Sequence, residues 1–262
     1  MPMVKVIIYK IQSFIWILET FKNWWVYSLG HFDLLDSKKE YVLRLRNGLK
    51  IIAKKEEFYS FKEILFANDY GIQNIRNNSL IVDIGANIGI FSLLVAHKFK
   101  NVKVYAFEPD PKAFSRLSKN ILINQQQNSV RAFNLAIGAK KEFRDFYVNK
   151  TTTVGNSFYI ENIASNQSGL IKVEVITLKD VFKMNNIAKC DFLKIDCEGA
   201  EYEIILSADS DVFSKIETIV LEYHLKGTGV LIETLQKNNF ICTFVDREDQ
   251  RSGILYASKN IK

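Results

Sequence analysis

From residue 80 onward, short apolar segments alternate with amphipathic stretches of helical length. This pattern is typical of a mainly parallel β-sheet with helices on both faces, and it predicts an α/β fold. Seven segments are expected to be strands: Leu80–Ile84, Val102–Phe107, Ser129–Phe133, Phe192–Ile195, Thr218–Tyr223, Phe240–Val245 and Ile254–Ala257. Residues 141–177 do not follow the alternation, so we expect a substrate-side insertion there.

Residues 39–79 lead into this region. Apolar and polar residues alternate on either side of Asn47-Gly48, which predicts a β-hairpin over residues 41–53. Apolar residues then recur at helical spacing over residues 56–70, which predicts a helix that ends before Gly71. No candidate catalytic residue stands out in this segment.

Residues 3–26 are apolar and aromatic, but charged and amide side chains interrupt them. Because no apolar run approaches about 18 residues, we expect no membrane-spanning helix. One apolar face at helical period predicts an amphipathic helix; it comprises Ile7, Ile11, Phe14, Ile15, Leu18, Phe21 and Trp25. Three roles for it stay open: docking on the main domain or on a second subunit of a homo-oligomer, peripheral membrane contact through residues 3–26, or a lid over the substrate.

The composition fits one large domain rather than a disordered chain, since 48% of the 262 residues are hydrophobic and 24% are charged. We therefore divide the chain into an N-terminal helical extension (1–38), a hairpin and helix (39–79) and a main domain (80–262). The net charge of +6 comes from scattered basic residues without a run of five like charges, so we expect no nucleic-acid partner. Three cysteines without metal-ligand spacing favour a cytoplasmic protein without disulfides or zinc.

A glycine turn follows the first predicted strand of the main domain, in the segment Ile81-Val-Asp-Ile-Gly-Ala-Asn-Ile-Gly-Ile-Phe91. Gly85 allows a sharp turn close to a ligand, and Gly89 permits close helix packing. Nineteen residues after Gly89, Glu108 ends the second strand, where a carboxylate can accept both hydroxyls of a ribose. Together, these two motifs predict a nucleoside-containing cofactor.

Asp83, two residues before the glycine turn, distinguishes between cofactors. A dinucleotide site needs a third glycine and would be repelled by an acid beside the phosphates, whereas an aspartate suits a cationic amine. S-adenosyl-L-methionine has such an amine and no phosphate. Asp83 therefore favours this methyl donor, with a buried, purely structural aspartate as the alternative.

Two further strands carry acids to the carboxyl edge of the sheet. Asp196 and Glu198 follow one strand, and Glu222 and His224 end another that we expect to be its neighbour. If the strands are neighbours, the four side chains converge, and His224 can act as general base while a carboxylate orients it. A structural histidine is the alternative interpretation.

Six motifs together carry a family resemblance: VDIGANIGIF, AFEPDP, LSKNILIN, ITLKDVF, DFLKIDCEGAE and VLEYH. They resemble the FkbM family of S-adenosylmethionine-dependent methyltransferases over roughly residues 40–245. The resemblance implies a class I methyltransferase fold, a Rossmann-like sheet of seven strands with the last strand antiparallel, and methyl transfer to oxygen. It implies these cofactor-binding residues: Asp83, Gly85, Ala86, Asn87, Gly89, Glu108, Pro109, Asn134, Leu135, Ala136 and Asp196.

The resemblance also implies that Asp196 and Glu198 lie near the transferred methyl group. We expect Asp196 to fix the acceptor hydroxyl, His224 to be the general base, and Glu198 or Glu222 to orient it. A Mg²⁺ ion that bridges Asp196 and Glu222 is an alternative, although we prefer a mechanism without metal. The expected acceptor is a sugar, a glycan or glycolipid, or a small secondary metabolite. A non-catalytic or differently specific S-adenosylmethionine-binding protein is the competing hypothesis, and a nucleic-acid or N-methyltransferase is less favoured.

Overall fold

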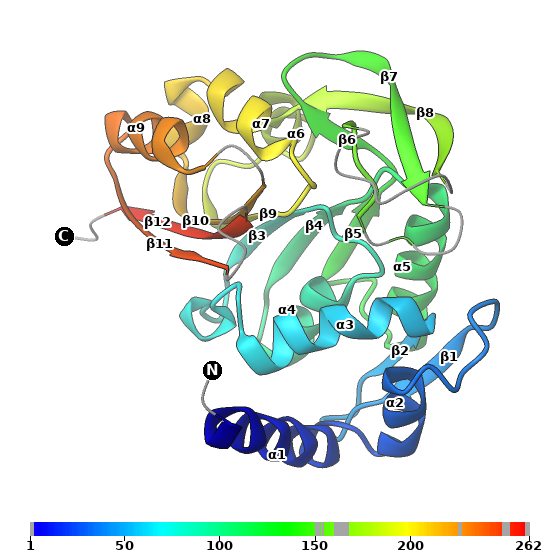
Figure 1. The fold of residues 1–262 in the computed structure, drawn as a ribbon. Helices are drawn as coiled ribbons and strands as arrows, with labels where there is room; N and C mark the ends of the chain where they lie inside the picture. The colour runs from blue at the N-terminus through cyan, green and yellow to red at the C-terminus, as the bar shows by residue number, and fades with distance from the viewer. Residues whose placement is uncertain are drawn as a thin grey trace.

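A seven-stranded sheet forms the centre of the computed structural model (Figure 1). The structure describes residues 3–149, 153, 155–159, 168–224, 227–247 and 252–259, with backbone only for residues 3–7 and 168. The strand order is β11-β12-β10-β9-β3-β4-β5. Their bounds are Leu80–Ile84 (β3), Lys103–Phe107 (β4), Val130–Phe133 (β5), Cys190–Ile195 (β9), Ile216–His224 (β10), Phe240–Asp246 (β11) and Ser252–Lys259 (β12).

These are the seven predicted strands, and their directions match the fold that the family resemblance implies. β3, β4, β5, β9 and β10 pair in parallel, whereas β12 is antiparallel to both β10 and β11. Because parallel strands all end at the same edge, the residues after β3, β4, β9 and β10 meet there. The predicted class I arrangement with an antiparallel last strand is confirmed.

Helices cover both faces of the sheet, as the alternating pattern predicts. α4 (Ile90–Lys98) and α5 (Pro111–Ile123) pack on one face. α6 (Leu178–Met184), α7 (Glu201–Ser207), α8 (Ser210–Ser214) and α9 (Gly229–Lys237) pack on the other. Ile81 and Val82 show why the strands are apolar throughout: these neighbours in β3 point to opposite faces, and each is fully buried in a different core cluster.

Two smaller sheets flank the main one. The hairpin predicted over residues 41–53 is present as β1 (Tyr41–Arg44) and β2 (Lys50–Ala53). Within the stretch 141–177, β7 (Glu142–Asn149) and β8 (Ser168–Thr177) form a three-stranded sheet with β6 (Ala136–Gly138). Since β6 directly follows the segment after β5, this sheet stands beside the carboxyl edge of the main sheet (Figure 1).

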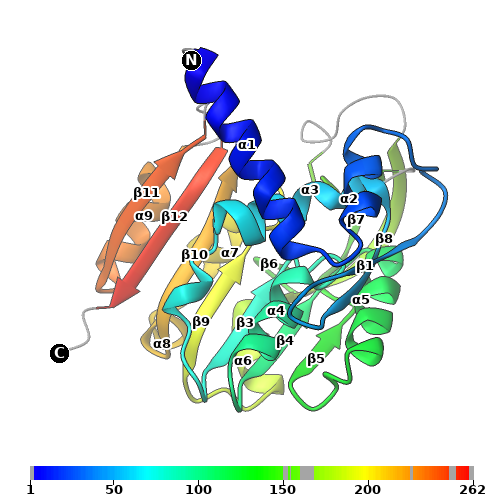
Figure 2. The ribbon, with the colours of Figure 1, turned by 90° about the horizontal axis from the view of Figure 1, so that it is seen from below.

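Two predicted helices are interrupted. The single helix expected over residues 3–26 is α1 (Met3–Thr20) and α2 (Trp24–His31), because the fully buried Phe21 leaves the helix and bridges to Leu45. The helix expected over residues 56–70 is a chain of short turns: η1 (Lys55–Glu57), α3 (Phe58–Phe61) and η2 (Lys62–Ala67), with η3 (Ile72–Asn74) beyond. Figure 2 shows α1 in front of the rest of the chain.

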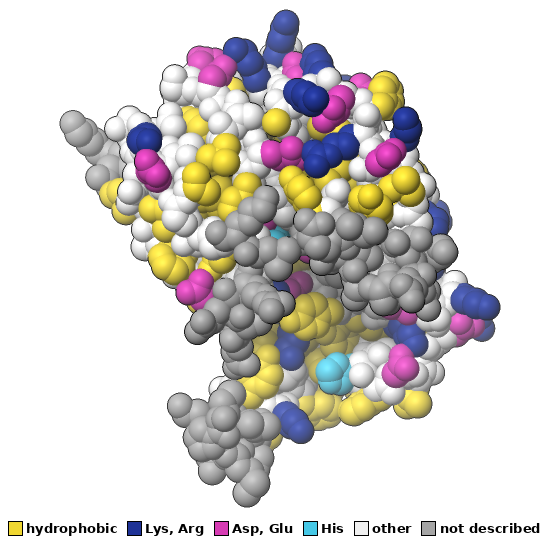
Figure 3. Space-filling model, turned by 45° about the horizontal axis from the view of Figure 1, so that its top comes forward, with side chains coloured by type: hydrophobic (Ala, Val, Ile, Leu, Met, Phe, Trp, Pro, Cys, Tyr) yellow, Lys and Arg dark blue, Asp and Glu magenta, His cyan; other side chains and the backbone are white. Residues whose placement is uncertain are grey.

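Basic and acidic side chains alternate over the upper part of the face drawn in Figure 3, as the scattered charges of the sequence predict. Cys190, Cys197 and Cys242 are free thiols. None of the helices in the described residues is long and apolar enough to span a bilayer.

Candidate active site

A cavity of about 330 Å³ opens at the carboxyl edge of the main sheet. Its wall includes most of the residues that the sequence predicts to be functional: Gly85, Asn87, Glu108, Pro109, Leu135, Ala136, Asp196, Glu198, Glu222 and His224. Residues from β6, β7 and the helical turns before β3 complete the wall. The topology therefore brings together residues that are as far as 139 positions apart in the sequence, from Gly85 to His224.

The glycine turn after β3 has room for backbone only. Gly85 adopts φ +76°, and a Cβ atom there would lie 1.7 Å from the carbonyl oxygen of Asp196. Gly89 adopts φ +88° at the start of α4, where a Cβ would lie 2.4 Å from the side chain of Leu117. Gly85 therefore lets the turn pass close to β9 at the cavity, and Gly89 packs against α5 and does not line the cavity.

Glu108 is held in place by two backbone amides. Its Oε2 accepts a hydrogen bond from Asn87 N–H and its Oε1 one from Asp110 N–H, both at 2.8 Å. Burial raises the pKa of this carboxyl to about 8, although the two amides oppose the shift. The two oxygens of Glu108 are thus fixed on the cavity wall, where the hydroxyls of a ribose could reach them.

Asn134 supports this strand end from behind. Its Nδ2 donates to the carbonyl oxygens of Glu108 and Pro109, at 2.8 and 2.9 Å. The neighbouring Leu135 and Ala136 reach the cavity wall, and Asn134 itself does not line it. The predicted cofactor-binding segment Asn134–Ala136 is thus adjacent to Glu108.

Asp83 lies beneath the cavity instead of on its wall. It is fully buried, and its two carboxylate oxygens accept from Lys194 Nζ at 3.0 Å and Ser92 Oγ at 2.6 Å. Lys194 Nζ also lies 3.1 Å from the carbonyl oxygen of Gly85 and 3.7 Å from Asp196. The counter-ion of Asp83 is therefore this lysine, contrary to our expectation of a cofactor amine. Ala86 is likewise buried outside the cavity wall.

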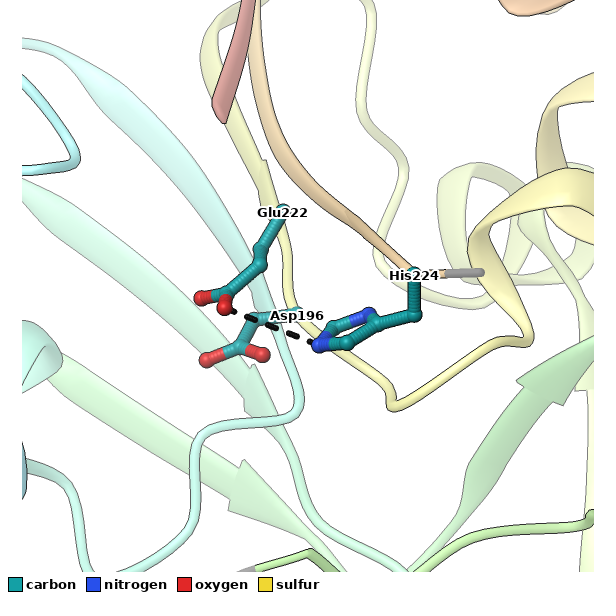
Figure 4. A group of neighbouring side chains, drawn as sticks. All are labelled: Asp196, Glu222 and His224. Atoms are coloured by element: carbon teal, nitrogen blue, oxygen red, sulfur yellow. Dashed lines mark ion pairs between the residues drawn. The ribbon is translucent and has the colours of Figure 1, made fainter. Parts of the chain in front are cut away.

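The predicted acids converge on His224 (Figure 4). Its Nε2 lies 3.4 Å from Glu198 Oε2 and 3.6 Å from Glu222 Oε1. Asp196, Glu222 and His224 each offer an atom within 4.8 Å of the others, which is close enough to hold a metal ion. The neighbouring positions of β9 and β10 explain this convergence, because Ile195 pairs with Leu221 immediately before the two acids.

His224 is tied most firmly to a residue outside this group. The buried carboxylate of Glu201 accepts from the His224 backbone N–H at 2.8 Å and contacts Nδ1 at 3.1 Å. Burial lowers the pKa of His224, but hydrogen bonds to Glu201 and Glu222 outweigh this effect and raise it to about 11. The raised pKa favours the protonated imidazole, which argues against its predicted role as general base.

Glu198 is better suited to accept a proton. It sits in a left-handed conformation (φ +52°) three residues after the end of β9, and this turn brings its carboxyl group to the cavity. Burial raises the pKa of Glu198 to about 7, against the opposing charge of His224. A carboxylate that titrates near neutral pH is matched to general-base chemistry.

Several residues of the site were missed by the sequence analysis. The buried Tyr70 lies with its hydroxyl oxygen 2.7 Å from Asp196 Oδ2 and 3.1 Å from Glu222 Oε2. Arg247 contacts Glu222 and Glu63 at 2.9 Å each, and burial raises the pKa of Glu63 to about 8. Tyr70 and Glu63 fall in the segment 56–70, where no motif marks them.

Lys194 and Glu201, in contrast, belong to the quoted DFLKIDCEGAE motif, so a signal was present in the sequence. Only the fold shows that these two residues pair with Asp83 and His224. A charged residue within a motif can thus be recognised as important without its partner being known.

Known methyltransferases resemble this chain in fold and in sequence. The solved structure described as the complex of aTrm5 and tRNALeu has a TM-score of 0.50 and 14% identity, covering 84% of this chain and 53% of that chain. This likeness is one of fold alone. Methyltransferase sdnD of Sordaria araneosa is 30% identical over 211 residues, which cover 70% of this chain and 82% of sdnD.

The 31-O-demethyl-FK506 methyltransferase FkbM of Streptomyces tacrolimicus is 26% identical over 238 residues, which cover 79% of this chain and 90% of that protein. Residues 83–242 match the family described as the methyltransferase FkbM domain. This match begins at the buried Asp83 and includes the glycine turn, Glu108 and the acids around His224. The chain therefore belongs to the FkbM methyltransferase domain family and is an S-adenosylmethionine-dependent methyltransferase.

Proposed function

We propose that this methyltransferase acts on a hydroxyl oxygen of a sugar, a glycan or glycolipid, or a small secondary metabolite. The observation that carries the proposal is the group of carboxylates, Asp196, Glu198 and Glu222, in the same cavity as Gly85 and Glu108. Carboxylates accept hydrogen bonds from hydroxyl groups and can take up their protons. The name of the Streptomyces tacrolimicus relative, 31-O-demethyl-FK506 methyltransferase FkbM, also describes methylation at an oxygen.

The cofactor end of the cavity fits S-adenosylmethionine, which supplies an electrophilic methyl carbon when bound. Gly85 leaves space where any side chain would collide with Asp196. Glu108, fixed by two amides, would accept the ribose hydroxyls, and Leu135 and Ala136 would line the adenine. Asp83 would act indirectly, because it holds Lys194 against the carbonyl of the glycine turn.

The acceptor end would use the carboxylates in different ways. Asp196 would accept the hydrogen bond of the acceptor hydroxyl and fix its oxygen in line with the methyl carbon. As the bond from the oxygen to the methyl carbon forms and the bond from that carbon to the sulfonium sulfur breaks, the hydroxyl proton, which Asp196 and Glu198 would share, would end on Glu198, whose pKa lies near 7. The protonated His224, held by Glu201, would orient Glu198 from a distance of 3.4 Å.

We prefer this chemistry without Mg²⁺. Asp196, Glu222 and His224 could surround an ion, but cationic side chains already contact them. Arg247 lies 2.9 Å from Glu222, and Lys194 lies 3.7 Å from Asp196. His224 would also have to lose a proton before its nitrogen could bind a metal. The positive charge that an ion would bring is therefore supplied by the protein.

The proposal is tested with S-adenosylmethionine labelled with ¹³C in its methyl group. The acceptor panel contains sugars, glycolipids, hydroxylated small metabolites and tRNA, and the methyl carbon shift in NMR distinguishes O-methyl from N-methyl products. We expect an O-methyl product. Labelled nitrogen, or label on tRNA alone, would overturn the proposal.

Asp196→Asn should abolish turnover and leave cofactor affinity, measured by calorimetry, within about threefold of the unchanged protein. Asp211→Asn is the matched control, because Asp211 is an exposed carboxylate on α8 that pairs with Lys215. Full turnover of the Asp196→Asn variant would remove Asp196 from the mechanism.

A further inference from the structure

The outer side of α1 is apolar and exposed to solvent. Ile8, Ile11, Phe14 and Ile15 are 47–54% exposed. Ile8, Ile11 and Phe14 recur every three positions and Ile15 follows Ile11 by four, so they form one side of the helix. Figures 1 and 2 place this helix at the periphery of the molecule, in front of the other elements when the chain is seen from below.

α2 extends this apolar side. Trp25, Leu29 and Phe32 are 52%, 39% and 70% exposed, and they follow helical spacing into the end of α2. The rings of Phe14 and Trp24 lie 6.5 Å apart and join the two helices. We call this set the α1–α2 apolar surface; it comprises Ile8, Ile11, Phe14, Ile15, Trp24, Trp25, Leu29 and Phe32.

The other side of the two helices is anchored to the domain. Ile17, Phe21 and Tyr27 are buried in one core cluster with Phe58 and Phe61. The rings of Phe21 and Tyr27 stack at 4.6 Å, and Tyr27 stacks on Phe58 at 5.6 Å. The orientation of the α1–α2 apolar surface is therefore fixed, and the domain itself does not cover it.

This exposure is concentrated in one part of the chain. Of the 22 large hydrophobic residues that are exposed in the described residues, ten fall between residues 8 and 34. Single exposed apolar side chains are ordinary on a protein surface, but a contiguous patch marks a site of interaction. The α1–α2 apolar surface is therefore a candidate binding surface for another molecule.

Cations border the surface. Lys10, Lys22, Arg44 and Arg46 are exposed. Arg46 Nε donates to the carbonyl oxygen of Leu18 at 2.7 Å, and Lys22 N–H donates to that of Arg44 at 2.7 Å, so three of the four gather where α1 meets α2. In the part of the chain that the structure describes, none of the four takes part in an ion pair.

Acids nearby do not neutralise this border. Asp33 pairs with Lys55, and Asp36 lies 4.0 Å from Lys39. Glu19 is the acid within α1, and it is exposed. The border of the α1–α2 apolar surface therefore carries an excess of positive charge, which favours an anionic partner.

We propose that the α1–α2 apolar surface binds an anionic lipid bilayer, with α1 lying in the interface. An apolar helix face with a basic border and adjacent tryptophans is the composition that interfacial helices use. A second copy of the chain fits less well. A two-fold interface would bring the same surface face to face with itself and place the four cations of each copy near those of the other.

The bound bilayer would lie close to the cavity. Phe66 on η2 contacts Tyr9 at 5.8 Å and Trp16 at 5.4 Å, between ring centroids, and Glu63 on the same turns lines the cavity. η2 thus separates α1 from the acceptor end of the site. The binding itself is independent of the proposed acceptor, and it can be measured without turnover.

The test uses the full chain and vesicles of phosphatidylcholine with or without phosphatidylglycerol. Co-sedimentation should occur with the anionic vesicles and weaken as salt is raised. All three tryptophans of the chain lie in α1 and α2, so a blue shift of the tryptophan emission on vesicle addition reports on this segment alone. No sedimentation with anionic vesicles would overturn the proposal.

Two variants and one control locate the contact. Ile11→Asp combined with Trp25→Asp should weaken vesicle binding about tenfold or more, and so should Lys10→Glu combined with Lys22→Glu. Phe143→Asp is the control, because Phe143 is 73% exposed on β7, outside the surface. Melting curves and calorimetry with S-adenosylmethionine check that each variant is folded. Equal binding by all variants, or a dimer in light scattering that Ile11→Asp dissociates, would contradict the bilayer proposal.

Discussion

The carboxylate of Glu201 binds His224 at two points, the backbone N–H at 2.8 Å and the ring Nδ1 at 3.1 Å. Glu201 itself is fully buried at the start of α7, and its other oxygen accepts from Gly199 N–H. This pair fixes the ring so that Nε2 faces Glu198 and Glu222. It also raises the pKa of the imidazole and so favours its protonated form.

Glu201→Gln should therefore lower the pKa of His224 from about 11 toward its usual value of 6.5. NMR titration of the ring protons measures this directly, with His224→Gln to assign the signal. Glu203 lies on the same helix as Glu201 and pairs with Arg144, so Glu203→Gln should leave the titration of His224 unchanged. A His224 signal that already titrates near pH 6.5 in the unchanged protein would contradict the prediction.

The same pair has a consequence for stability. The folded chain holds the His224 proton more tightly than the unfolded chain, so the stabilisation is complete below pH 6.5 and is lost as pH rises toward about 11. Denaturant unfolding at several pH values should show a steeper loss of stability in this range for the unchanged protein than for Glu201→Gln. Parallel curves would mean that the pair does not shift the histidine.

Glu198 should determine the pH dependence of turnover. Burial raises its pKa to about 7, so its base form and the rate should increase as pH rises through about 7. Glu198→Gln should lower kcat about 100-fold to 10,000-fold and remove that inflection. Glu233→Gln is the control, since Glu233 is exposed on α9 and pairs with Lys237. A Glu198→Gln variant that keeps the inflection would exclude Glu198 as the base.

Tyr70 is expected to position the carboxylates. Its hydroxyl lies within hydrogen-bond distance of both Asp196 and Glu222, and Tyr70→Phe would leave these oxygens without it. We expect kcat to fall about tenfold to 100-fold while cofactor affinity stays unchanged. Tyr27→Phe is a matched control, because the Tyr27 hydroxyl is also buried and donates to Phe58 O at 3.2 Å, away from the cavity.

Both tyrosine variants should lose about 1 kcal/mol of unfolding free energy, as for other single buried hydrogen bonds. Only Tyr70→Phe should change kcat. If the two variants had equal kcat, the role of Tyr70 would be structural.

Gly85 should tolerate no side chain. A Cβ atom would lie 1.7 Å from Asp196 O, and φ is +76°. Gly227→Ala is the matched control, because Gly227 has φ +69° and no atom within 4 Å of its Cβ position. We expect a loss of about 1 kcal/mol for Gly227→Ala and about 3 kcal/mol or more for Gly85→Ala, with cofactor binding lost in the latter. Thermal melts and calorimetry measure both, and equal effects would show that the close approach to Asp196 is unimportant.

The strands and motifs of the sheet could be predicted because their signals are local. β3 is an apolar run followed by glycine, and Asp110, directly before Pro111, caps α5 by accepting from Lys112 N–H at 2.9 Å. These features depend on neighbouring residues in the chain. The edge of a parallel sheet then collects the motif residues without further information.

The partners of the charged residues could not be predicted, since they depend on contacts between distant segments. Asp83 pairs with Lys194, which is 111 positions away, and Tyr70 reaches Glu222 across 152 positions. The counter-ion of Asp83 and the proton on His224 depend on such pairs, with Lys194 and Glu201 respectively. The roles predicted for Asp83 and His224 did not take these contacts into account, because the sequence alone does not show which distant residues pair.

Removal of divalent ions should leave the methyl transfer intact. Lys194, His224 and Arg247 already contact the carboxylates that an ion would bind, so activity after treatment with EDTA and gel filtration should stay within about twofold of the untreated enzyme. Arg247→Gln sharpens the test, because it removes the cation 2.9 Å from Glu222 and Glu63 and should create a site where added Mg²⁺ binds measurably by calorimetry. The unchanged protein should show no such binding. Loss of activity on chelation that Mg²⁺ restores in the unchanged enzyme would instead assign Asp196 and Glu222 to a metal ion.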